Sequence, residues 1–233
     1  MTVPLDRRLE SAPAPLFAPL GLALPLRIEQ TGRDAFDAEP ALASFVLRSA
    51  LAVLEADAMA AGFDSAGVAS EATLELTRRL ANEIGDRTVV LGTLAAGSAT
   101  AGAVEGLCRA GATGLVVLEE ADDPDPGLLG GLDAAFNLAA YYQVPAVYLA
   151  RRTVDAGVLD AARAAGARWA VGPGDTDGAV ASIPLELFGR HEPAASDWAA
   201  GLPRGVRLYI SSWEIPADTP VEAVAAVRRA LCA

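Results

Sequence analysis

The sequence predicts an α/β fold, a (β/α)8 barrel of the TIM type, because short apolar runs alternate with helical patterns along the chain. The clearest unit spans residues 87–121, where the apolar runs 88–91 and 114–118 are typical of strands buried on both faces. The apolar residues between the runs recur at helical spacing, and Gly111 favours a helix end. A helix that joins two parallel strands makes a βαβ unit, which needs a layer of helices outside the sheet.

Further strands are predicted at residues 22–28, 63–69, 144–149, 168–171, 183–188 and 206–211. Helices are predicted between them, from residue 40 to Gly62 and at residues 70–84, 126–142, 153–165, 193–202 and 220–231. Eight such strands, each followed by a helix or a long connection, fit a single closed barrel domain over residues 22–233. Residues 1–21 are apolar and punctuated by proline, and we expect them to form an N-terminal arm across the barrel.

An open, doubly wound sheet is the structural alternative. Its dinucleotide-binding forms carry a G-x-G-x-x-G loop after the first strand. Here Gly92, Gly97 and Gly102 recur at five-residue spacing instead. This spacing is a poor cradle for a dinucleotide, and we therefore prefer the barrel.

The charge balance restricts the partners of the chain. Thirty acidic residues against eighteen basic ones give a formal net charge of −12, which repels nucleic acid and anionic lipid. No apolar run approaches the roughly 20 residues of a membrane span, and the N-terminus lacks the features of a signal peptide. We expect a cytoplasmic protein with no nucleic-acid or membrane partner. All the basic residues are arginine, which excludes Schiff-base chemistry on a lysine.

Cysteine and histidine are too scarce for several kinds of site. Cys108 and Cys232 are the only thiols, and His191 is the only histidine. A zinc site built from cysteine and histidine would need all three to converge from distant places. We therefore expect no thiolate-zinc site, no disulfide framework and no Ser-His-Asp triad, while a metal site made of carboxylates alone stays open.

Charged residues follow three predicted strands, at the edge where parallel α/β folds place their chemistry. Glu71 and Glu119 follow two of these strands, and two carboxylates in one cavity would raise the pKa of one of them. Arg151 and Arg152 follow a third strand, and a guanidinium binds a carboxylate as a fork. The structural alternatives are a favourable charge at a helix N-terminus for Glu71, a solvated edge for Glu119, and a surface pair for the arginines.

Three further side chains are candidates for the site. His191 lies in a loop after a late strand, where a general acid could be placed, although a surface histidine is the more common outcome. Trp213, together with Trp169, could form an aromatic wall for a planar ligand, and core packing is the alternative. Tyr148 lies within a predicted strand and is a candidate for substrate binding or for the core.

Four segments resemble the uroporphyrinogen decarboxylase superfamily. Residues 208–224, LYISSWEIPADTPVEAV, are similar to the family's closing I-x-P-x-T-P-x-E-N-V, and residues 189–193, GRHEP, to its G-N-x-D-P. Residues 64–71, DSAGVASE, resemble the strand D-A-x-x-x-F-S-D and put Glu71 in the place of the catalytic aspartate. A rival register that starts at Asp57 would put Asp64 there, but it sets the predicted helix end where the strand should lie. Residues 30–33, QTGR, echo a Q-A-G-R motif whose arginines hold substrate carboxylates.

The resemblance implies a uroporphyrinogen decarboxylase-like barrel. The family includes a cofactor-free decarboxylase and cobalamin-linked methyltransferases that hold zinc on histidine and cysteines. Here Leu149 and Arg151 take the places of the H-x-C ligands, and Trp213 takes the place of the last cysteine and of the decarboxylase histidine. A decarboxylase-like enzyme without metal or cofactor is thus implied, with a small-molecule substrate, a carboxylated aromatic or heterocycle.

The resemblance and the strand ends together give the expected site. The expected catalytic residues are Glu71, Glu119, Arg151 and His191, and the expected substrate-binding residues are Arg33, Arg152, Tyr148 and Trp213. The alternative function is that of a zinc-less methyltransferase-like protein, or of a non-catalytic relative that binds a tetrapyrrole or a corrinoid. Family analogy and the apolar N-terminal segment further suggest a homodimer.

Overall fold

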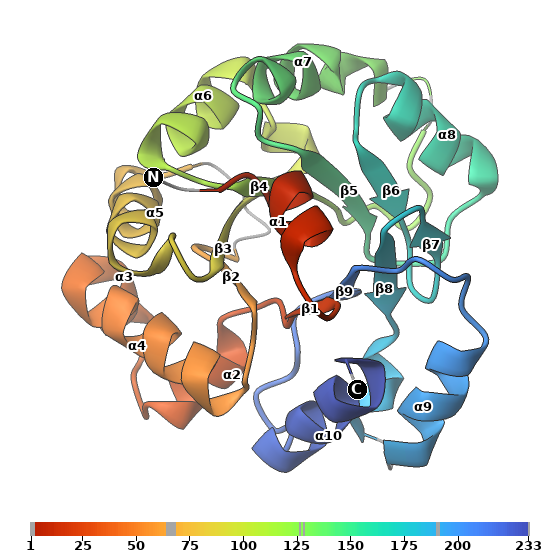
Figure 1. The fold of residues 1–233 in the computed structure, drawn as a ribbon. Helices are drawn as coiled ribbons and strands as arrows, with labels where there is room; N and C mark the ends of the chain where they lie inside the picture. Colours follow the sequence, from red (N-terminus) through yellow and green to blue (C-terminus); the bar gives the residue numbers. More distant parts are fainter. Residues whose placement is uncertain (1–2, 64–68, 126, 128, 190–191, 233) are drawn as a thin grey trace.

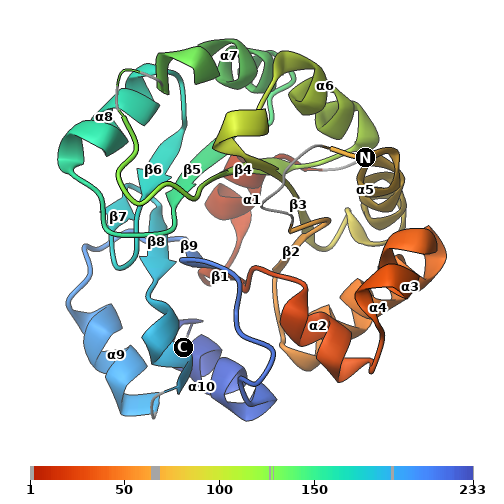
Figure 2. The same ribbon diagram turned by 180° about the vertical axis from the view of Figure 1, so that it is seen from behind.

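The computed structural model describes residues 3–63, 69–125, 127, 129–189 and 192–232. In these residues the strands are arranged in a ring with helices around it (Figure 1; Figure 2). The strands are β1 (Leu16–Ala18), β2 (Ala58–Ala60), β3 (Val89–Ala95), β4 (Gly114–Glu119), β5 (Ala146–Ala150), β6 (Trp169–Val171), β7 (Thr176–Asp177), β8 (Val180–Ile183) and β9 (Leu208–Ser211).

The α-helices are α1 (Leu5–Ser11), α2 (Ala23–Ile28), α3 (Arg33–Ala38), α4 (Pro40–Val53), α5 (Glu71–Ile84), α6 (Ala101–Ala110), α7 (Asp133–Tyr141), α8 (Ala156–Ala164), α9 (Glu192–Ala200) and α10 (Val221–Cys232). Three 3-10 turns connect some of them: η1 (Ala96–Ser98), η2 (Leu129–Leu132) and η3 (Leu185–Gly189). None of the helices in the described ranges combines the length and apolar composition that crossing a membrane requires.

The strands form two hydrogen-bonded sheets instead of one closed ring. The larger sheet has the order β2-β3-β4-β5-β6 and is parallel throughout. The smaller sheet has the order β1-β9-β8-β7, in which only β7 runs antiparallel. Within the described residues no backbone ladder joins β1 to β2 or β6 to β7, and the predicted full closure is wrong in this respect. The strands at these two seams have two or three residues, which leaves few N–H groups to pair.

An aspartate side chain spans each seam. At the β1/β2 seam the Phe17 N–H donates to Asp57 Oδ2 (3.0 Å), and the Asp57 N–H donates to the Phe17 carbonyl (2.9 Å). At the β6/β7 seam the Ala170 N–H donates to Asp177 Oδ2 (2.8 Å). A strand N–H in the interior needs an acceptor, and each carboxylate supplies the one that a neighbouring strand would provide.

The first predicted strand is wrong. Residues 22–28 form α2, with Pro25 in the first turn where its missing N–H is tolerated, and the first strand is β1, within the segment predicted to be an arm. Residues 64–68, which make up most of the second predicted strand, lie outside the described residues, and the second described strand is β2. This strand comes early because α4 ends at Val53, where Glu55 turns the backbone to a positive φ of 50°.

The later part of the chain follows the predicted order. The strands β3, β4, β5, β6 and β9 lie within two residues of the predicted starts. The strand β8 ends where its predicted counterpart begins, because Pro184 cannot donate to a ladder and the chain turns into η3. The helix predicted for residues 126–142 is shorter, since η2 precedes α7.

Two apolar clusters hold the helices to the ring. One cluster includes Val116, Leu118, Val147 and Leu149, together with residues of α2, α4 and α10. The second, which we call the outer cluster, lies between β3–β6 and the helices α6, α7 and α8. Successive residues of β4 and β5 alternate between the two clusters, as the side chains of a strand do.

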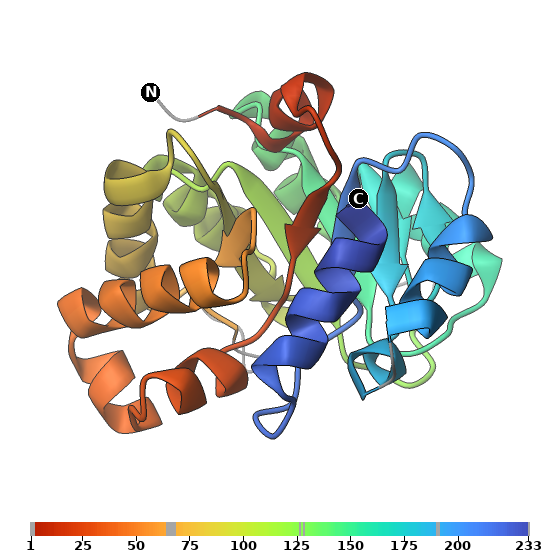
Figure 3. The same ribbon diagram turned by 60° about the horizontal axis from the view of Figure 1, so that its bottom comes forward.

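The helix α1 covers the N-terminal end of the ring (Figure 3). The Leu5 N–H donates to the Thr113 carbonyl just before β4 (2.8 Å), and Arg207 Nε, just before β9, donates to the Leu9 carbonyl (3.1 Å). Leu5 is fully buried, and a Cβ added at Gly114 would lie 3.0 Å from Leu5 Cδ2. With this end covered, the opposite end of the ring, where the strands terminate, is the place for a site.

Candidate functional site

An arginine and two aromatic rings meet at the C-terminal ends of the strands. The Arg151 guanidinium lies over the Trp213 ring, 5.7 Å from its centroid. The Trp213 ring packs edge-on against Phe63, with centroids 5.5 Å apart and planes at 86°. These three residues follow β5, β9 and β2, and we call them the mouth cluster. The cation–π geometry stabilises the guanidinium against an aromatic wall.

The end of β5 explains where Arg151 lies. The Arg151 N–H donates to the Glu119 carbonyl (2.9 Å), which extends the β4–β5 ladder one residue past the strand. The Arg151 side chain is exposed, Trp213 is half-buried, and Phe63 is buried. The charged Arg151 guanidinium therefore packs on apolar aromatic rings at the edge of the ring of strands.

The Arg151 guanidinium has no acidic partner among the described residues. No carboxylate of the described residues forms an ion pair with it, whereas the adjacent Arg152 is paired with Asp122 at 2.5 Å. The Asp122–Arg152 pair is exposed on both sides and links the β4 and β5 loops. A guanidinium without a carboxylate partner is the better seat for a ligand carboxylate, and Arg151 meets this condition.

The Glu119 carboxylate forms its hydrogen bonds outside the mouth cluster. The Tyr148 hydroxyl donates to Glu119 Oε2 (3.3 Å), and the Ala121 N–H donates to Oε1 (2.9 Å). Tyr148 is fully buried in the outer cluster, and burial, reinforced by the Glu119 charge, raises the pKa of its phenol well above the ordinary value. The phenol therefore stays a neutral donor, enclosed between strand and helices, and substrate binding by Tyr148 stays a prediction. Glu119 instead lines a cavity of about 350 Å³ with Asp123 and Asp125.

Glu71 has the environment of a helix terminus. It is the first residue of α5 and is exposed, and the preceding Ser70 caps the helix by accepting the Thr73 N–H (3.1 Å). Glu71 does not line the cavity beside Glu119, so the predicted pair of carboxylates in one cavity is not formed. The carboxylate instead favours the positive end of the helix dipole.

The position of β2 reverses the preference between the two registers of the resemblance. The strand begins directly after Asp57, as the register that starts there requires, and α4 has ended well before it. This register puts Asp64 in the place of the family's catalytic aspartate. Asp64 and the predicted catalytic residue His191 lie outside the described residues.

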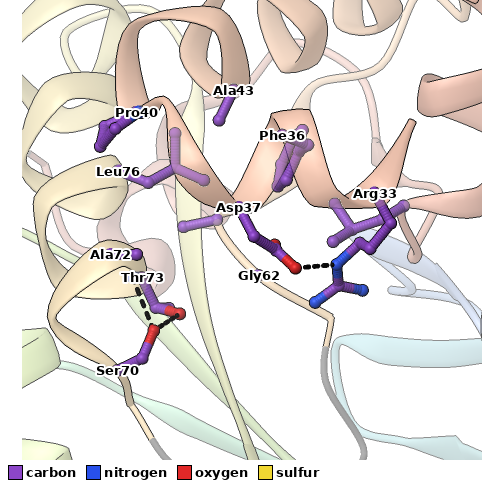
Figure 4. A pocket seen from close by; sticks show the side chains of 12 residues that line it. Arg33, Phe36, Asp37, Pro40, Ala43, Gly62, Ser70, Ala72, Thr73 and Leu76 are labelled. Carbon is purple, nitrogen blue, oxygen red and sulfur yellow. Dashed lines mark hydrogen bonds and ion pairs between the residues drawn. The ribbon is translucent and has the colours of Figure 1, made fainter. Parts of the chain in front are cut away.

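A cavity of about 210 Å³ lies beside the end of β2, between α3, α4 and α5 (Figure 4). Arg33 stands at its rim, where Nε is paired with Asp37 at 2.7 Å. Apolar and hydroxyl side chains complete the wall: Phe36, Leu76, Ser70 and Thr73. Gly62 also lines the cavity, and the next residue, Phe63, belongs to the mouth cluster. The predicted substrate-binding residue Arg33 thus lies at a cavity that adjoins the mouth cluster.

The donor set does not suit a zinc ion. Within the described part of the chain, no group of three histidine, cysteine, aspartate or glutamate residues could hold a metal. Where the resemblance places zinc ligands, the chain presents the guanidinium of Arg151 and the indole of Trp213, which are not zinc ligands. Burial raises the pKa of the Cys108 and Cys232 thiols to about 11, which keeps them protonated near neutral pH.

Sequence reasoning missed three residues of this region. Phe63 was assigned to a strand, and Ser211 and Glu214, which flank Trp213, were given no role. Ser211 Oγ accepts the Leu20 N–H (2.8 Å), and Glu214 Oε1 accepts the N–H of Leu22 (2.7 Å). The available signal was the run of polar residues, Ser-Ser-Trp-Glu, directly after a buried strand.

The comparisons with known proteins support the fold. A methyltransferase from Methanosarcina mazei superposes with a TM-score of 0.71 over 96% of this chain and 95% of that chain, at 12% identity. The chain shares its fold. No family model matches the chain, and no curated protein matches its sequence.

Two weaker matches are lyases or hydrolases. A 2,3-dimethylmalate lyase of the PEP mutase/isocitrate lyase superfamily matches with a TM-score of 0.48 and 18% identity, over 97% of this chain and 81% of that chain. An oxaloacetate acetylhydrolase matches with a TM-score of 0.45 and 16% identity, over 80% of this chain and 76% of that chain. Scores this low add nothing about the chemistry of the chain.

Proposed function

We propose that the chain is a lyase of the decarboxylase type that needs no cofactor and acts on a small carboxylated aromatic or heterocyclic compound at the mouth cluster. The observation that carries the proposal is the Arg151 guanidinium over the Trp213 ring, with no carboxylate partner in the described residues. A ligand carboxylate would bind the guanidinium as a fork, while the planar ring packs against Trp213 and Phe63. The 12%-identical methyltransferase supports the barrel and leaves the reaction to be tested.

The reaction divides into two tasks. When the bond between the ring carbon and the carboxylate breaks, carbon dioxide leaves and the electron pair stays on the ring carbon, which then takes a proton. Arg151 would orient the carboxylate, and the aromatic wall would hold the ring in place. The Glu119 carboxylate is bonded to Tyr148 and to the Ala121 N–H, and Glu71 is an exposed residue at the start of α5. We therefore take Asp64, from the register that starts at Asp57, and His191 as the candidates for the proton donor.

Binding and turnover are testable together. The full chain is titrated calorimetrically with benzoate, salicylate, pyrrole-2-carboxylate and nicotinate, and carbon dioxide release is measured for each compound. Arg151→Ala removes the carboxylate seat, and we expect binding to weaken roughly 10- to 100-fold, as losing a charged hydrogen bond implies. Asp64→Asn and His191→Asn each remove one candidate proton donor. The variant that lacks the true donor should release no carbon dioxide and should still bind the carboxylated compounds.

Arg168→Ala is the matched control. The Arg168 guanidinium also lies 5.7 Å from a tryptophan ring, that of Trp169, but it precedes β6 at the other end of the strands. The control should bind every compound as the unaltered chain does. Equal loss in both variants, or no binding to any compound, would contradict the proposal.

A binding relative without catalysis is the second candidate, together with a methyltransferase-like role without zinc. It is favoured by the engagement of Glu119 with Tyr148 and the Ala121 N–H, which removes that carboxylate from the mouth cluster. Haem and cobalamin are the probes for this class. A change in their visible spectra on adding the protein, without carbon dioxide release from the carboxylates, would favour it over the lyase.

A further inference from the structure

We propose that Glu214 is a positioning residue, which fixes the loop after β9 so that the Trp213 indole stays against the Arg151 guanidinium. The inference rests on the proposed function, because Trp213 and Arg151 form the ligand site that it would hold in place. The Glu214 carboxylate binds backbone N–H groups of the facing loop and would act on Trp213 through the backbone.

The Glu214 carboxylate is bound to the loop that follows β1. Its Oε1 accepts the N–H groups of Leu22 (2.7 Å) and Ala23 (2.9 Å). Glu214 is half-buried. Hydrogen bonds to an ionised acceptor are stronger than neutral ones, so this carboxylate ties the two loops firmly together.

Ser211 provides a second tie on the other side of Trp213. The fully buried Ser211 Oγ accepts the Leu20 N–H (2.8 Å) and donates to the Trp213 carbonyl (2.8 Å). The Ile215 N–H donates to the Leu20 carbonyl (3.0 Å). We call the contacts of Ser211 and Glu214 with residues 20–23 the latch. Ser211 before Trp213 and Glu214 after it thus both fix the backbone of this loop, and neither bond involves the indole ring.

Gly21 permits the close approach of the two loops. Its φ is +111°, and a Cβ at this position would lie 2.3 Å from Glu214 Cγ and 3.0 Å from Glu214 Cα. Only glycine adopts this backbone without strain and leaves room for the glutamate. The sequence therefore places glycine in one loop and glutamate in the other as complementary parts of the latch.

The ring positions that the latch controls are those of the mouth cluster. The Trp213 centroid lies 5.5 Å from that of Phe63, and the Arg151 guanidinium carbon lies 5.7 Å from the Trp213 ring. Arg151 is exposed and has a long, flexible side chain, so its preferred place depends on where the indole lies. Freeing the loop would let the indole turn away and would remove both the wall and the support of the guanidinium.

The test observes Trp213 without requiring a ligand. The full chain is labelled with 5-fluorotryptophan, and each of its three tryptophans gives a fluorine resonance. The resonance of Trp213 is identified by its loss in Trp213→Phe. Glu214→Ala and Ser211→Ala are compared with Glu214→Gln, in which the amide oxygen still accepts both N–H groups, and with Glu222→Ala, an exposed glutamate at the start of α10.

We expect the Trp213 resonance to shift and to lose at least half its height in Glu214→Ala and Ser211→Ala. It should stay unchanged in Glu214→Gln and Glu222→Ala, and the resonances of Trp169 and Trp198 should stay unchanged in all variants. An unaltered Trp213 resonance in Glu214→Ala would overturn the proposal. So would a change in all three resonances, because it would show a general structural role.

A benzoate titration separates this proposal from the proposed function. If benzoate binds the unaltered chain, Glu214→Ala should weaken binding at least fivefold, and Glu214→Gln should restore the original affinity. If benzoate binds no variant while the Trp213 resonance responds as expected, the ligand assignment fails and the positioning role stands. Equal affinity in Glu214→Ala and the unaltered chain would refute the positioning role.

Discussion

Charged residues at the ends of two adjacent strands meet different surroundings. Glu119 ends β4 and contacts Tyr148 of the outer cluster, whereas Arg151 follows β5 and reaches Trp213 beyond β9. The sequence predicts both at the strand ends but not the side of the ring that each faces. The reason is physical: β4 and β5 are apolar on both faces, so no polar–apolar alternation marks the inward side. Packing against α6, α7 and α8 decides which side of the ring each side chain faces.

The two thiols give a prediction at the residue scale. Burial raises the pKa of Cys108 and Cys232 from 9.0 to about 11, so their thiolate forms dominate only above that pH. At pH 8 the native chain should contain roughly 100-fold less thiolate than the unfolded chain. Iodoacetamide should therefore alkylate both residues slowly at pH 8, and the rate should rise about tenfold per pH unit up to pH 10. Equal rates in buffer and in urea at pH 8 would contradict this assignment.

Element boundaries depend on features that local patterns do not reveal. Residues 56–61, which contain β2, are rich in alanine, which favours helix, and the predicted helix runs through them to Gly62. In the structure the positive φ of Glu55 ends the helix, and Asp57 pairs with Phe17, which starts β2. The contact joins residues 40 positions apart, so it is invisible to local periodicity. The βαβ unit of β3, α6 and β4 was predictable because its signals are all local.

The covered end of the ring gives a prediction at the element scale. A methyl group at Gly114 would lie 3.0 Å from Leu5 Cδ2 and 2.9 Å from Leu91 Cδ2. Gly114→Ala should destabilise the fold by about 1–3 kcal/mol through overpacking, and Leu5→Ala by about 2–5 kcal/mol through the lost core contact. The double variant should lose less than the sum, because the truncated leucine makes room for the methyl group. Urea unfolding measures all three, and strict additivity would refute the contact.

At the scale of the whole molecule, each seam joins the two sheets through an aspartate and an arginine of an outer helix. Asp57 lies 3.6 Å from Arg228 of α10, and Asp177 lies 2.8 Å from Arg163 of α8. The class of fold and the order of helices could be predicted from the sequence, because each unit repeats a local pattern. The seams could not be predicted, because they depend on which neighbouring short strands do not form a backbone hydrogen-bond ladder. A homodimer and a cytoplasmic location stay predictions.

The seams give a prediction at this scale. Asp57→Ala and Asp177→Ala each leave a strand N–H without its acceptor, and we expect a loss of about 1–3 kcal/mol of unfolding free energy for each. Hydrogen exchange at the Phe17 and Ala170 amides should accelerate in the respective variant. Asp122→Ala, which removes an exposed ion pair with Arg152, should cost no more than about 1 kcal/mol. Equal losses in all three variants would rule out a special role for the seams.

A crystal structure with a bound carboxylated aromatic compound would show whether the mouth cluster is the ligand site. The compound that binds most tightly in the calorimetric panel is soaked into crystals of the full chain. We expect its carboxylate on the Arg151 guanidinium and its ring against Trp213 and Phe63. A ligand found instead in the cavity beside Glu119, or at the end of the ring covered by α1, would contradict it.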